Sequence, residues 1–577
     1  MNDITIRIAG ANGDGIDSSG DLIAKVFLNV GLNVFAYRSY QSIIRGGHVW
    51  HQVRISQNEL HGPGEKINIL VALNQDSIDL QSAHMAEGGS VIYDGSKSNV
   101  DALKDRGLNL VNLPMLDIVL KNGGDPLLKN VVAIGAIMKM TGIDIGVFSD
   151  IIKSKFGKKG EMIVNNNINS AKAGYDDPAV KNIMELKGDG KKRYMMDGNT
   201  ALSIGAFASG CRFYAAYPMT PASGILHWFA AHQKLGVVVK QTEDEIAAIN
   251  MTIGAASAGA RSMCGTSGGG FSLMVEALGL SGMLEVPIVV VDSQRGGPST
   301  GLPTKTEQGD LLFVSHASQG EFPRIVVSPR NIKESLYVGA EAHNLAEKYQ
   351  CPVIILMDLY ISEHAESINT FELEGIKVDR GKIATKSDGR FKRYEITTDG
   401  ISPRSFPGTP GLEFIAPSDE HDEYGNLVTD FNAGIDKYVG IRRQMHEKRM
   451  RKIDTMLKEE KGVFVPDVSN ADAEYFFVTF GSTTESVMEA VELLSPSGKK
   501  FGIISFKYLM PLDVEKTKAL LSGKKLIDVE YNFTAQLAYL IKANTCIDIS
   551  HRILKYDGEA FTGREIADKA LELVSKW

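Results

Sequence analysis

Cysteine is scarce in this sequence of 577 residues, and the few that occur lie far apart. They are Cys211, Cys264, Cys351 and Cys546. None forms a CxxC pair, and no histidine lies at zinc-ligand spacing from them. We therefore expect reduced thiols in a cytoplasmic compartment, and neither a metal site nor an iron–sulfur cluster within this chain.

Long hydrophobic runs and an excess of positive charge are also missing. The longest apolar runs, such as residues 286–291, have the length of a strand and cannot span a bilayer. The first residues lack the basic and apolar regions of a signal peptide. A net charge of −8 argues against general nucleic-acid binding. The length predicts a globular chain of about three to five domains.

A glycine loop is the first motif. Residues 10–15, GANGDG, lie between a predicted strand at 4–9 and a predicted helix at 18–30. Backbone N–H groups around Gly13 and Gly15 could hold a phosphate at the helix start. The loop is not a dinucleotide fingerprint, because an asparagine interrupts it and no acidic residue ends the next strand. Its Gly-Asp-Gly triplet also lacks a suitably placed asparagine to form a thiamine diphosphate magnesium site.

Further strand-like segments extend this first α/β domain to about residue 175, and a short polar linker follows at residues 176–193. Within the domain, Arg45 precedes two glycines in IIRGGH. Such an arginine could bind an anion or could lie at the surface in a turn. The sequence leaves both interpretations open.

Residues 194–363 alternate strands with helices, which predicts a second domain with a parallel sheet. Ligands of parallel sheets lie at the carboxyl ends of the strands. The loops expected at this edge are residues 217–224, 241–245, 266–270 and 293–304. Their convergence indicates a ligand site, independent of any family.

The first of these loops, YPMTPASG, contains two prolines that remove backbone donors and stiffen the chain. It could be an ordinary connection, or it could hold the hydroxyls of Tyr217 and Thr220 at the site. Its position beside the other three loops favours the second interpretation. Thr220 is then the expected contact, and Tyr217 helps to position it.

Two charged residues in the other loops have alternative explanations. Glu245 could close a capping box with Thr242, or it could present a carboxyl with a raised pKa, because apolar residues follow it. Arg295 lies between a strand and two glycines. Its guanidinium suits a carboxylate or phosphate ligand, although an ion pair with Glu307 is the alternative.

Residues 364–470 are charged and rich in glycine and proline, which predicts an insertion or linker. Within them, residues 442–452 place six basic residues on a helical pattern. This pattern predicts a solvated helix face, with a docking patch for an acidic partner as the alternative. Residues 471–577 return to alternating strands and helices and predict a final α/β domain.

Several motifs together resemble the 2-oxoacid:ferredoxin oxidoreductases. YPMTP at residues 217–221 is similar to the family's YPITP, and QRGGPSTGLPT at residues 294–304 matches its substrate loop closely. GANGDG and IRGGH resemble the family's γ domain, and VEYNFTAQL at residues 529–537 resembles VExNxxGQL, with alanine replacing glycine. The matches cover nearly the whole chain in γ-then-α order. The sequence is therefore identified as similar to a fused γ/α subunit.

The resemblance implies a multidomain α/β fold. A γ domain at residues 1–175 would face coenzyme A, and residues 194–363 would form a thiamine diphosphate pyrimidine-binding domain. Residues 471–577 would form a transketolase C-terminal-like domain. The residues on the coenzyme A side would be Arg45, Gly13 and Gly15.

By the same resemblance, Glu245 would hydrogen-bond the pyrimidine ring of thiamine diphosphate, near Gly268 and Gly269. Thr220 and Arg295 would hold the carboxylate of a 2-oxoacid. Thr304 would lie nearby on the substrate side, with Tyr217 beside it.

The family's reaction would be the oxidative decarboxylation of a 2-oxoacid, with 2-oxoglutarate favoured, to acyl-coenzyme A with reduction of ferredoxin. A separate β subunit would carry Mg²⁺, the diphosphate site and a [4Fe-4S] cluster in an (αβ)₂ assembly. This chain alone would then be inactive. Two other enzyme classes remain open: a thiamine-dependent decarboxylase or transferase without electron transfer, and an acyl-coenzyme A or nucleotide-binding transferase.

Overall fold

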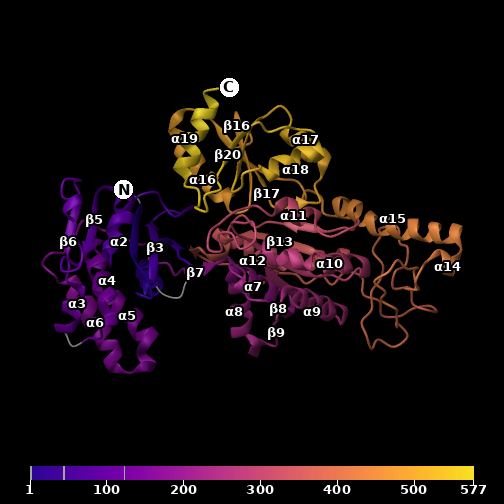
Figure 1. Cartoon of the computed structure of the whole chain (residues 1–577), viewed down its shortest axis with the longest axis horizontal. Coiled ribbons are helices and arrows are strands. Elements are labelled where there is room, and N and C mark those ends of the chain that lie inside the picture. The colour runs from indigo at the N-terminus through magenta and orange to yellow at the C-terminus, as the bar shows by residue number, and fades with distance from the viewer. Residues whose placement is uncertain (1–2, 43–45, 122–123) are drawn as a thin grey trace. The chain divides into compact units, whose positions relative to one another are not determined.

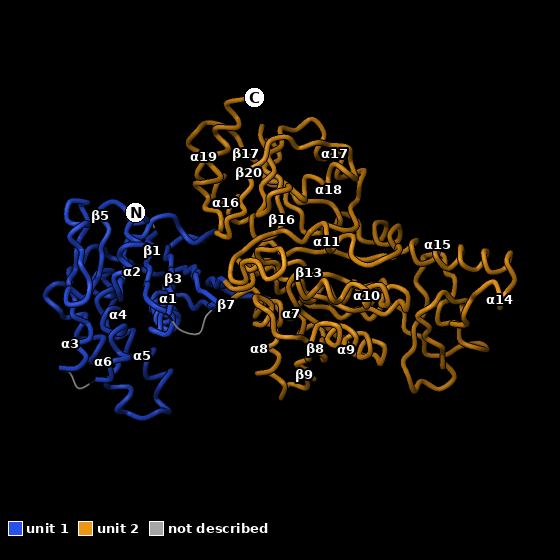
Figure 2. The backbone as a smooth tube through the Cα atoms, viewed as in Figure 1, with its two compact units in different colours: residues 1–196, 364–371 blue, residues 197–363, 372–577 orange. Residues whose placement is uncertain are grey.

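The computed structural model describes residues 3–42, 46–121 and 124–577. The chain divides into two compact units, which Figure 2 colours separately. The first unit comprises Met1–Met196 and His364–Phe371, and the second comprises Asp197–Glu363 and Glu372–Trp577. The finer division into five segments stays a prediction.

Figure 1 labels several strands of the sheet of the first unit. Its strands are β1 (Asp3–Asn12), β2 (Asn33–Ser39), β3 (Gly46–Ser56), β4 (Ile67–Ala72), β5 (Met85–Tyr93), β6 (Asn109–Asn112), β7 (Tyr194–Asp197) and β14 (Ala365–Ile368). They follow the order β6-β5-β4-β1-β3-β2-β14-β7. Strands β1, β4, β5 and β6 pair in parallel, whereas β3 is antiparallel to both β1 and β2. The late strand β14 pairs antiparallel with β2.

Helices cover both faces of this sheet. They are α1 (Ile16–Asn29), α2 (Gln75–Gln81), α3 (Met115–Lys121), α4 (Lys129–Met140), α5 (Ile145–Phe156) and α6 (Glu161–Tyr175). The alternation in β1 sends Ile6 and Ile8 into a core with Phe27 of α1. Leu70 and Ile78 belong to a second cluster that contains α2. The predicted strand, glycine loop and helix at the start of the chain are thus present.

The segment at residues 176–193 runs along the first unit without a helix or strand. Leu186 donates its backbone N–H to the carbonyl of Thr141 at 3.0 Å. Arg193 donates from Nη1 to the carbonyl of Gly31 at 2.6 Å. Backbone and side-chain hydrogen bonds therefore fix this polar segment to the unit.

The second unit contains the predicted parallel sheet. Its strands are β8 (Cys211–Ala216), β9 (Val238–Gln241), β10 (Arg261–Thr266), β11 (Val289–Gln294), β12 (Ile325–Val327), β13 (Val353–Asp358) and β18 (Tyr508–Met510). The order is β18-β12-β13-β11-β10-β8-β9, and pairs among β8 to β13 are parallel. β18 is antiparallel to β12 and comes from the C-terminal part of the chain.

Helices flank this sheet on both sides, so its strands are buried on both faces. The helices are α7 (Gly198–Ala208), α8 (Ser223–Ala231), α9 (Glu245–Ser257), α10 (Gly268–Leu284), α11 (Leu311–His316), α12 (Ile332–Tyr349) and α13 (Leu359–Glu363). Val290 of β11 packs in a cluster with α9 and α10. Val289 and Val291 pack in the cluster that contains α7, α8 and α12.

A further sheet forms near the C-terminus. Its strands are β15 (Asp467–Ser469), β16 (Tyr475–Phe480), β17 (Phe501–Phe506), β19 (Lys525–Glu530) and β20 (His551–Leu554), in the order β15-β17-β16-β19-β20. Its helices are α16 (Thr483–Leu494), α17 (Val514–Leu521), α18 (Gln536–Thr545) and α19 (Gly563–Val574). The strands and helices predicted for residues 471–577 are therefore present.

The insertion ends in α14 (Asp430–Ala433) and α15 (Ile435–Glu459). The prediction that the six basic residues at 442–452 face solvent is wrong for half of them, because Lys448, Arg449 and Lys452 are buried. Both lysines pair with Glu285, and Arg449 pairs with Glu420.

Throughout the described ranges, no helix combines the length and apolar character needed to cross a membrane.

Candidate active site

The edge at the carboxyl ends of β8 to β11 gathers the loops singled out from the sequence. Thr242, after β9, donates its backbone N–H to the carbonyl of the last residue of β8 at 3.0 Å. Thr266 Oγ1, at the end of β10, donates to Met219 Sδ at 3.7 Å. Arg295, directly after β11, donates from Nη1 to the carbonyl of Thr220 at 2.8 Å. The structure therefore brings the four predicted segments together.

Glu245 does not form a capping box. The N-cap of α9 is Asp244, whose carboxylate accepts the N–H of Ala247 at 2.8 Å. Thr242 donates its hydroxyl to the carbonyl of Asp244 at 2.8 Å. The capping hypothesis is wrong, because the helix begins at Glu245 and Asp244 supplies the acceptor.

The carboxyl of Glu245 is buried and packs closely against Gly270. Only 3% of the residue is exposed, and its Oε1 has no hydrogen-bond partner among the described residues. A Cβ atom at Gly270 would overlap both this oxygen and the hydroxyl of Thr266. An unpaired buried polar atom costs about 1–3 kcal/mol. The candidate site thus includes a buried carboxyl oxygen whose hydrogen-bonding capacity the described residues leave unused.

The sequence predicted a loop at the segment SGGG, residues 267–270, but the structure has the start of a helix there. Gly268 begins α10, and the preceding serine is the N-cap. The first turn of a helix presents N–H groups that have no partner within the helix. Gly268 and Gly269 line a cavity of about 210 Å³ together with Arg295 and Asp310. The predicted cofactor-side glycines thus lie beside the predicted substrate-side arginine.

Two other predicted residues, Thr304 and Tyr217, lie in the loops of this edge, and their roles stay predictions. Thr304 is half-buried in the loop after β11, which an antiparallel bridge between Gly296 and Leu302 closes. Tyr217 is 41% exposed at the start of its loop. Arg45 lies outside the described residues.

In the first unit, Gly13 and Gly15 adopt positive φ angles of 101° and 76° in the predicted glycine loop. Asp14 between them accepts the N–H of Ala11 at 3.2 Å and pairs with Lys129 at 3.3 Å. Part of the loop's capacity to bind an anion is therefore satisfied by its own aspartate. Its role towards coenzyme A stays a prediction.

Sequence reasoning missed a group of carboxyls at the active-site edge. Asp292 of β11 is fully buried, and neither of its oxygens has a hydrogen-bond partner within the described ranges. Burial raises its pKa well above the usual range, and Asp310 raises it further. Burial and the nearby Glu307 raise the pKa of Asp310 to about 6. The available signal was the acidic residue that interrupts the apolar run of β11.

The C-terminal sheet also helps to fix this edge. Asp358, the last residue of β13, accepts the hydroxyl of Ser482 at 2.6 Å and Nε2 of Gln308 at 3.2 Å. Gln308 also accepts the N–H of Tyr531 at 3.1 Å and donates to the carbonyl of Phe480 at 3.1 Å. The loop after β11 is therefore tied to both sheets of the second unit.

Comparisons with known proteins add an independent finding. Residues 204–439 match the family model for pyruvate flavodoxin/ferredoxin oxidoreductase, thiamine diphosphate-binding, and residues 5–177 match that for pyruvate ferredoxin/flavodoxin oxidoreductase. The 2-oxoacid:ferredoxin oxidoreductase subunit alpha of a Sulfolobus species is 34% identical, with 98% of this chain and 96% of the relative covered. The chain belongs to the 2-oxoacid:ferredoxin oxidoreductase family.

Other members of this family are similarly close to the chain. The 2-oxoglutarate oxidoreductase subunit KorA of Mycobacterium tuberculosis is 30% identical, with 98% of this chain and 91% of the relative covered. The solved 2-oxoglutarate:ferredoxin oxidoreductase of Magnetococcus marinus is 34% identical, with a TM-score of 0.91 and 99% of both chains covered. The predicted resemblance and the multidomain α/β fold are therefore confirmed.

Proposed function

We propose that this chain binds the pyrimidine side of thiamine diphosphate in a 2-oxoacid:ferredoxin oxidoreductase. The observation that carries the proposal is the buried Oε1 of Glu245, which packs against Gly270 and has no hydrogen-bond partner among the described residues. A heterocyclic ring nitrogen that reached this oxygen would satisfy the carboxyl. Glu245 would then hold a proton in a hydrogen bond to that nitrogen.

Bound thiamine diphosphate would supply the carbon nucleophile that adds to the oxo group of a 2-oxoacid. The chain's own contribution is to orient the ring through Glu245 and to hold the substrate. Arg295 lines the cavity beside the first turn of α10, so a guanidinium and free helix N–H groups both favour an anion there. The carbonyl of Thr220 fixes one end of the Arg295 guanidinium. We assign Thr220, Thr304 and Tyr217 to the same substrate side.

We propose 2-oxoglutarate as the substrate and coenzyme A as the acyl acceptor. The supporting relative is the Magnetococcus marinus enzyme, whose structure holds 2-oxoglutarate, coenzyme A and succinyl-coenzyme A. The γ domain at residues 1–175, with Arg45, Gly13 and Gly15, is the part that we propose to face coenzyme A.

The rest of the catalytic machinery would lie in a β subunit. The four cysteines of this chain are far apart in sequence, which does not suit a cluster-binding motif. We therefore place Mg²⁺, the diphosphate site and a [4Fe-4S] cluster in the β subunit of an (αβ)₂ assembly, with ferredoxin as electron acceptor. The isolated chain is expected to show no turnover.

The test is to reconstitute the chain with its co-encoded partner and to measure coenzyme A-dependent dye reduction. We expect activity with 2-oxoglutarate above that with pyruvate and branched 2-oxoacids. Glu245→Gln should lower turnover at least about 100-fold, because a positioned proton-holding group is lost. The matched control is Glu243→Gln, two residues earlier and exposed, which should keep near-normal turnover.

Near-normal turnover of Glu245→Gln would contradict the pyrimidine assignment. Circular dichroism on each variant separates lost chemistry from lost folding. Equal rates with all 2-oxoacids would overturn the substrate proposal while leaving the role of Glu245 in place.

A further inference from the structure

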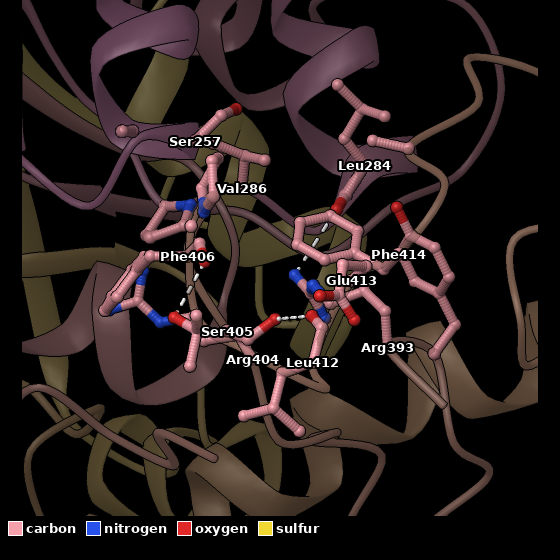
Figure 3. Close-up of a pocket in the computed structure, with 17 residues that line it drawn as sticks. Ser257, Leu284, Val286, Arg393, Arg404, Ser405, Phe406, Leu412, Glu413 and Phe414 are labelled. Atoms are coloured by element: carbon pink, nitrogen blue, oxygen red, sulfur yellow. Dashed lines mark hydrogen bonds between the residues drawn. The ribbon is translucent and has the colours of Figure 1, made fainter. Parts of the chain in front are cut away.

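A second cavity lies at the opposite edge of the parallel sheet. It has a volume of about 310 Å³, and its lining includes Ser257 at the end of α9, Leu284 at the end of α10, and Val286 before β11 (Figure 3). Glu245 begins α9 and Arg295 follows β11, so the candidate active site lies at the other ends of these same elements. The two cavities are therefore separate.

The insertion completes the lining of this second cavity. Phe406, Leu412 and Phe414 surround it together with Leu284 and Val286, as Figure 3 shows. The hydroxyl of Ser405 donates to the carbonyl of Leu412 at 2.7 Å, which fixes this part of the wall. The volume is at the small end of protein ligand sites, about 300–1,000 Å³. Such a cavity suits a short acyl chain or one aromatic ring.

Arg393 brings a positive charge to this apolar lining. It is only 3% exposed, and its Nη2 donates to the carbonyl of Glu285 at 2.8 Å. Its Nη1 is buried without a hydrogen-bond partner in the described part of the chain. An unpaired donor on a buried charged group is costly, since charge-assisted hydrogen bonds are the stronger kind. The guanidinium therefore retains an unused capacity to bind an anion.

Arg404, also 3% exposed, is a second guanidinium in the lining. It shares the carboxylate of Glu347 with Arg261 and Arg380. Its Nε has no hydrogen-bond partner among the residues described. One carboxylate thus serves three guanidinium groups, and Glu413 adds a second carboxylate to the lining; with Arg393 the guanidinium groups still outnumber the carboxylates, which leaves excess positive charge beside the cavity. A bound anion would reduce this excess.

We propose that this cavity binds a small monocarboxylate with an apolar body. The carboxylate would pair with the guanidinium groups of Arg393 and Arg404, and the apolar body would pack between Phe406 and Phe414. A planar carboxylate matches the guanidinium geometry, and the apolar walls disfavour a more highly charged ligand. This proposal does not depend on the function proposed above.

Titration calorimetry of the full chain with octanoate tests the proposal, with octanamide as the neutral ligand of the same size. We expect octanoate to bind with a dissociation constant below about 1 mM and octanamide to bind at least about tenfold more weakly. Arg393→Gln should weaken octanoate binding at least about tenfold. Ser257→Phe, which fills the cavity without removing a charge, should abolish it.

Arg295→Gln is the matched control, because it removes an arginine from the candidate active site. Octanoate binding should be unchanged in this variant. Loss of binding in Arg295→Gln, unchanged binding in folded Ser257→Phe, or equal binding of octanoate and octanamide would each overturn the proposal. No binding of octanoate at 1 mM would do the same. If Arg393→Gln fails to fold, Ser257→Phe still decides the outcome.

Discussion

Replacing Glu285 with glutamine is expected to destabilise the second unit strongly. The side chain is fully buried, and its carboxylate oxygens lie 2.5 Å from the Nζ atoms of Lys448 and Lys452. Both ammonium groups are also fully buried, on α15. Burial alone would raise the pKa of Glu285, but the two lysines hold it well below the usual range. The native carboxylate is therefore ionised and stabilises the charged forms of both lysines, against burial, which lowers the pKa of Lys448 to about 7 and also lowers that of Lys452.

Removing one partner of a buried ion pair costs about 3–5 kcal/mol, whereas replacing the whole group with apolar residues is often neutral. Glu285→Gln leaves two buried lysines without their anionic partner, so we expect the free energy of unfolding to fall by about 3–5 kcal/mol. The triple variant that adds Lys448→Met and Lys452→Met should recover most of this loss. Urea unfolding followed by circular dichroism measures all three proteins.

Glu474→Gln is the matched surface control. Glu474 pairs with Lys525 at 2.7 Å, and both side chains are exposed. Such a pair contributes little, because water screens it, so the urea midpoint should not change measurably. The reasoning fails if Glu285→Gln shifts the midpoint as little as Glu474→Gln does. It also fails if the triple variant is less stable than the single one.

Three further predictions follow from the same contacts. The pKa of Glu285 is lower in the folded than in the unfolded protein, where it is about 4.3, so ionised Glu285 stabilises the fold above pH ~4.3. The difference in free energy of unfolding between wild type and Glu285→Gln should therefore narrow as the pH falls below this value. A difference that stays constant with pH would contradict this. Gly270→Ala should lower turnover on the order of 100-fold, because its methyl group would displace Glu245. Gly254→Ala, which meets no neighbouring atom, should leave turnover unchanged, and similar losses in both variants would refute the steric argument. Arg295→Lys keeps the charge but loses the guanidinium fork, so KM for the 2-oxoacid should rise ~10-fold with little change in kcat; a purely kcat effect would argue against a substrate contact.

Local patterns predicted much of the second unit. Residues 194–363, predicted to alternate strands with helices, contain the parallel strands β8 to β13, and the apolar run before Arg295 became the buried strand β11. Continuous β-branched residues favour strands with both faces covered, which is the situation in a parallel sheet. The convergence of the loops followed, because parallel strands direct their carboxyl ends to one edge.

The same local reasoning failed where a distant partner decides the environment of a side chain. Lys448 and Lys452 appeared solvated, because basic residues on a helix usually face water. Their acceptor, Glu285, lies 163 residues from Lys448 in the sequence. No periodicity within α15 could reveal this carboxylate. Strand β14 shows the same limit, because it pairs with β2 from the other end of the unit's sequence.

The sequence by itself determined the α/β class, the parallel sheet and the family, since these depend on local periodicity and on motifs in a fixed order. Only the tertiary structure decided between the two explanations of Glu245. Asp244 took the capping position, and Gly270, from another helix, packs against the carboxyl. Burial and unsatisfied hydrogen bonds depend on atoms brought together by folding. The start of the helix at Glu245 therefore excludes its capping role, and the burial of its carboxyl depends on Gly270, which lies outside its sequence context.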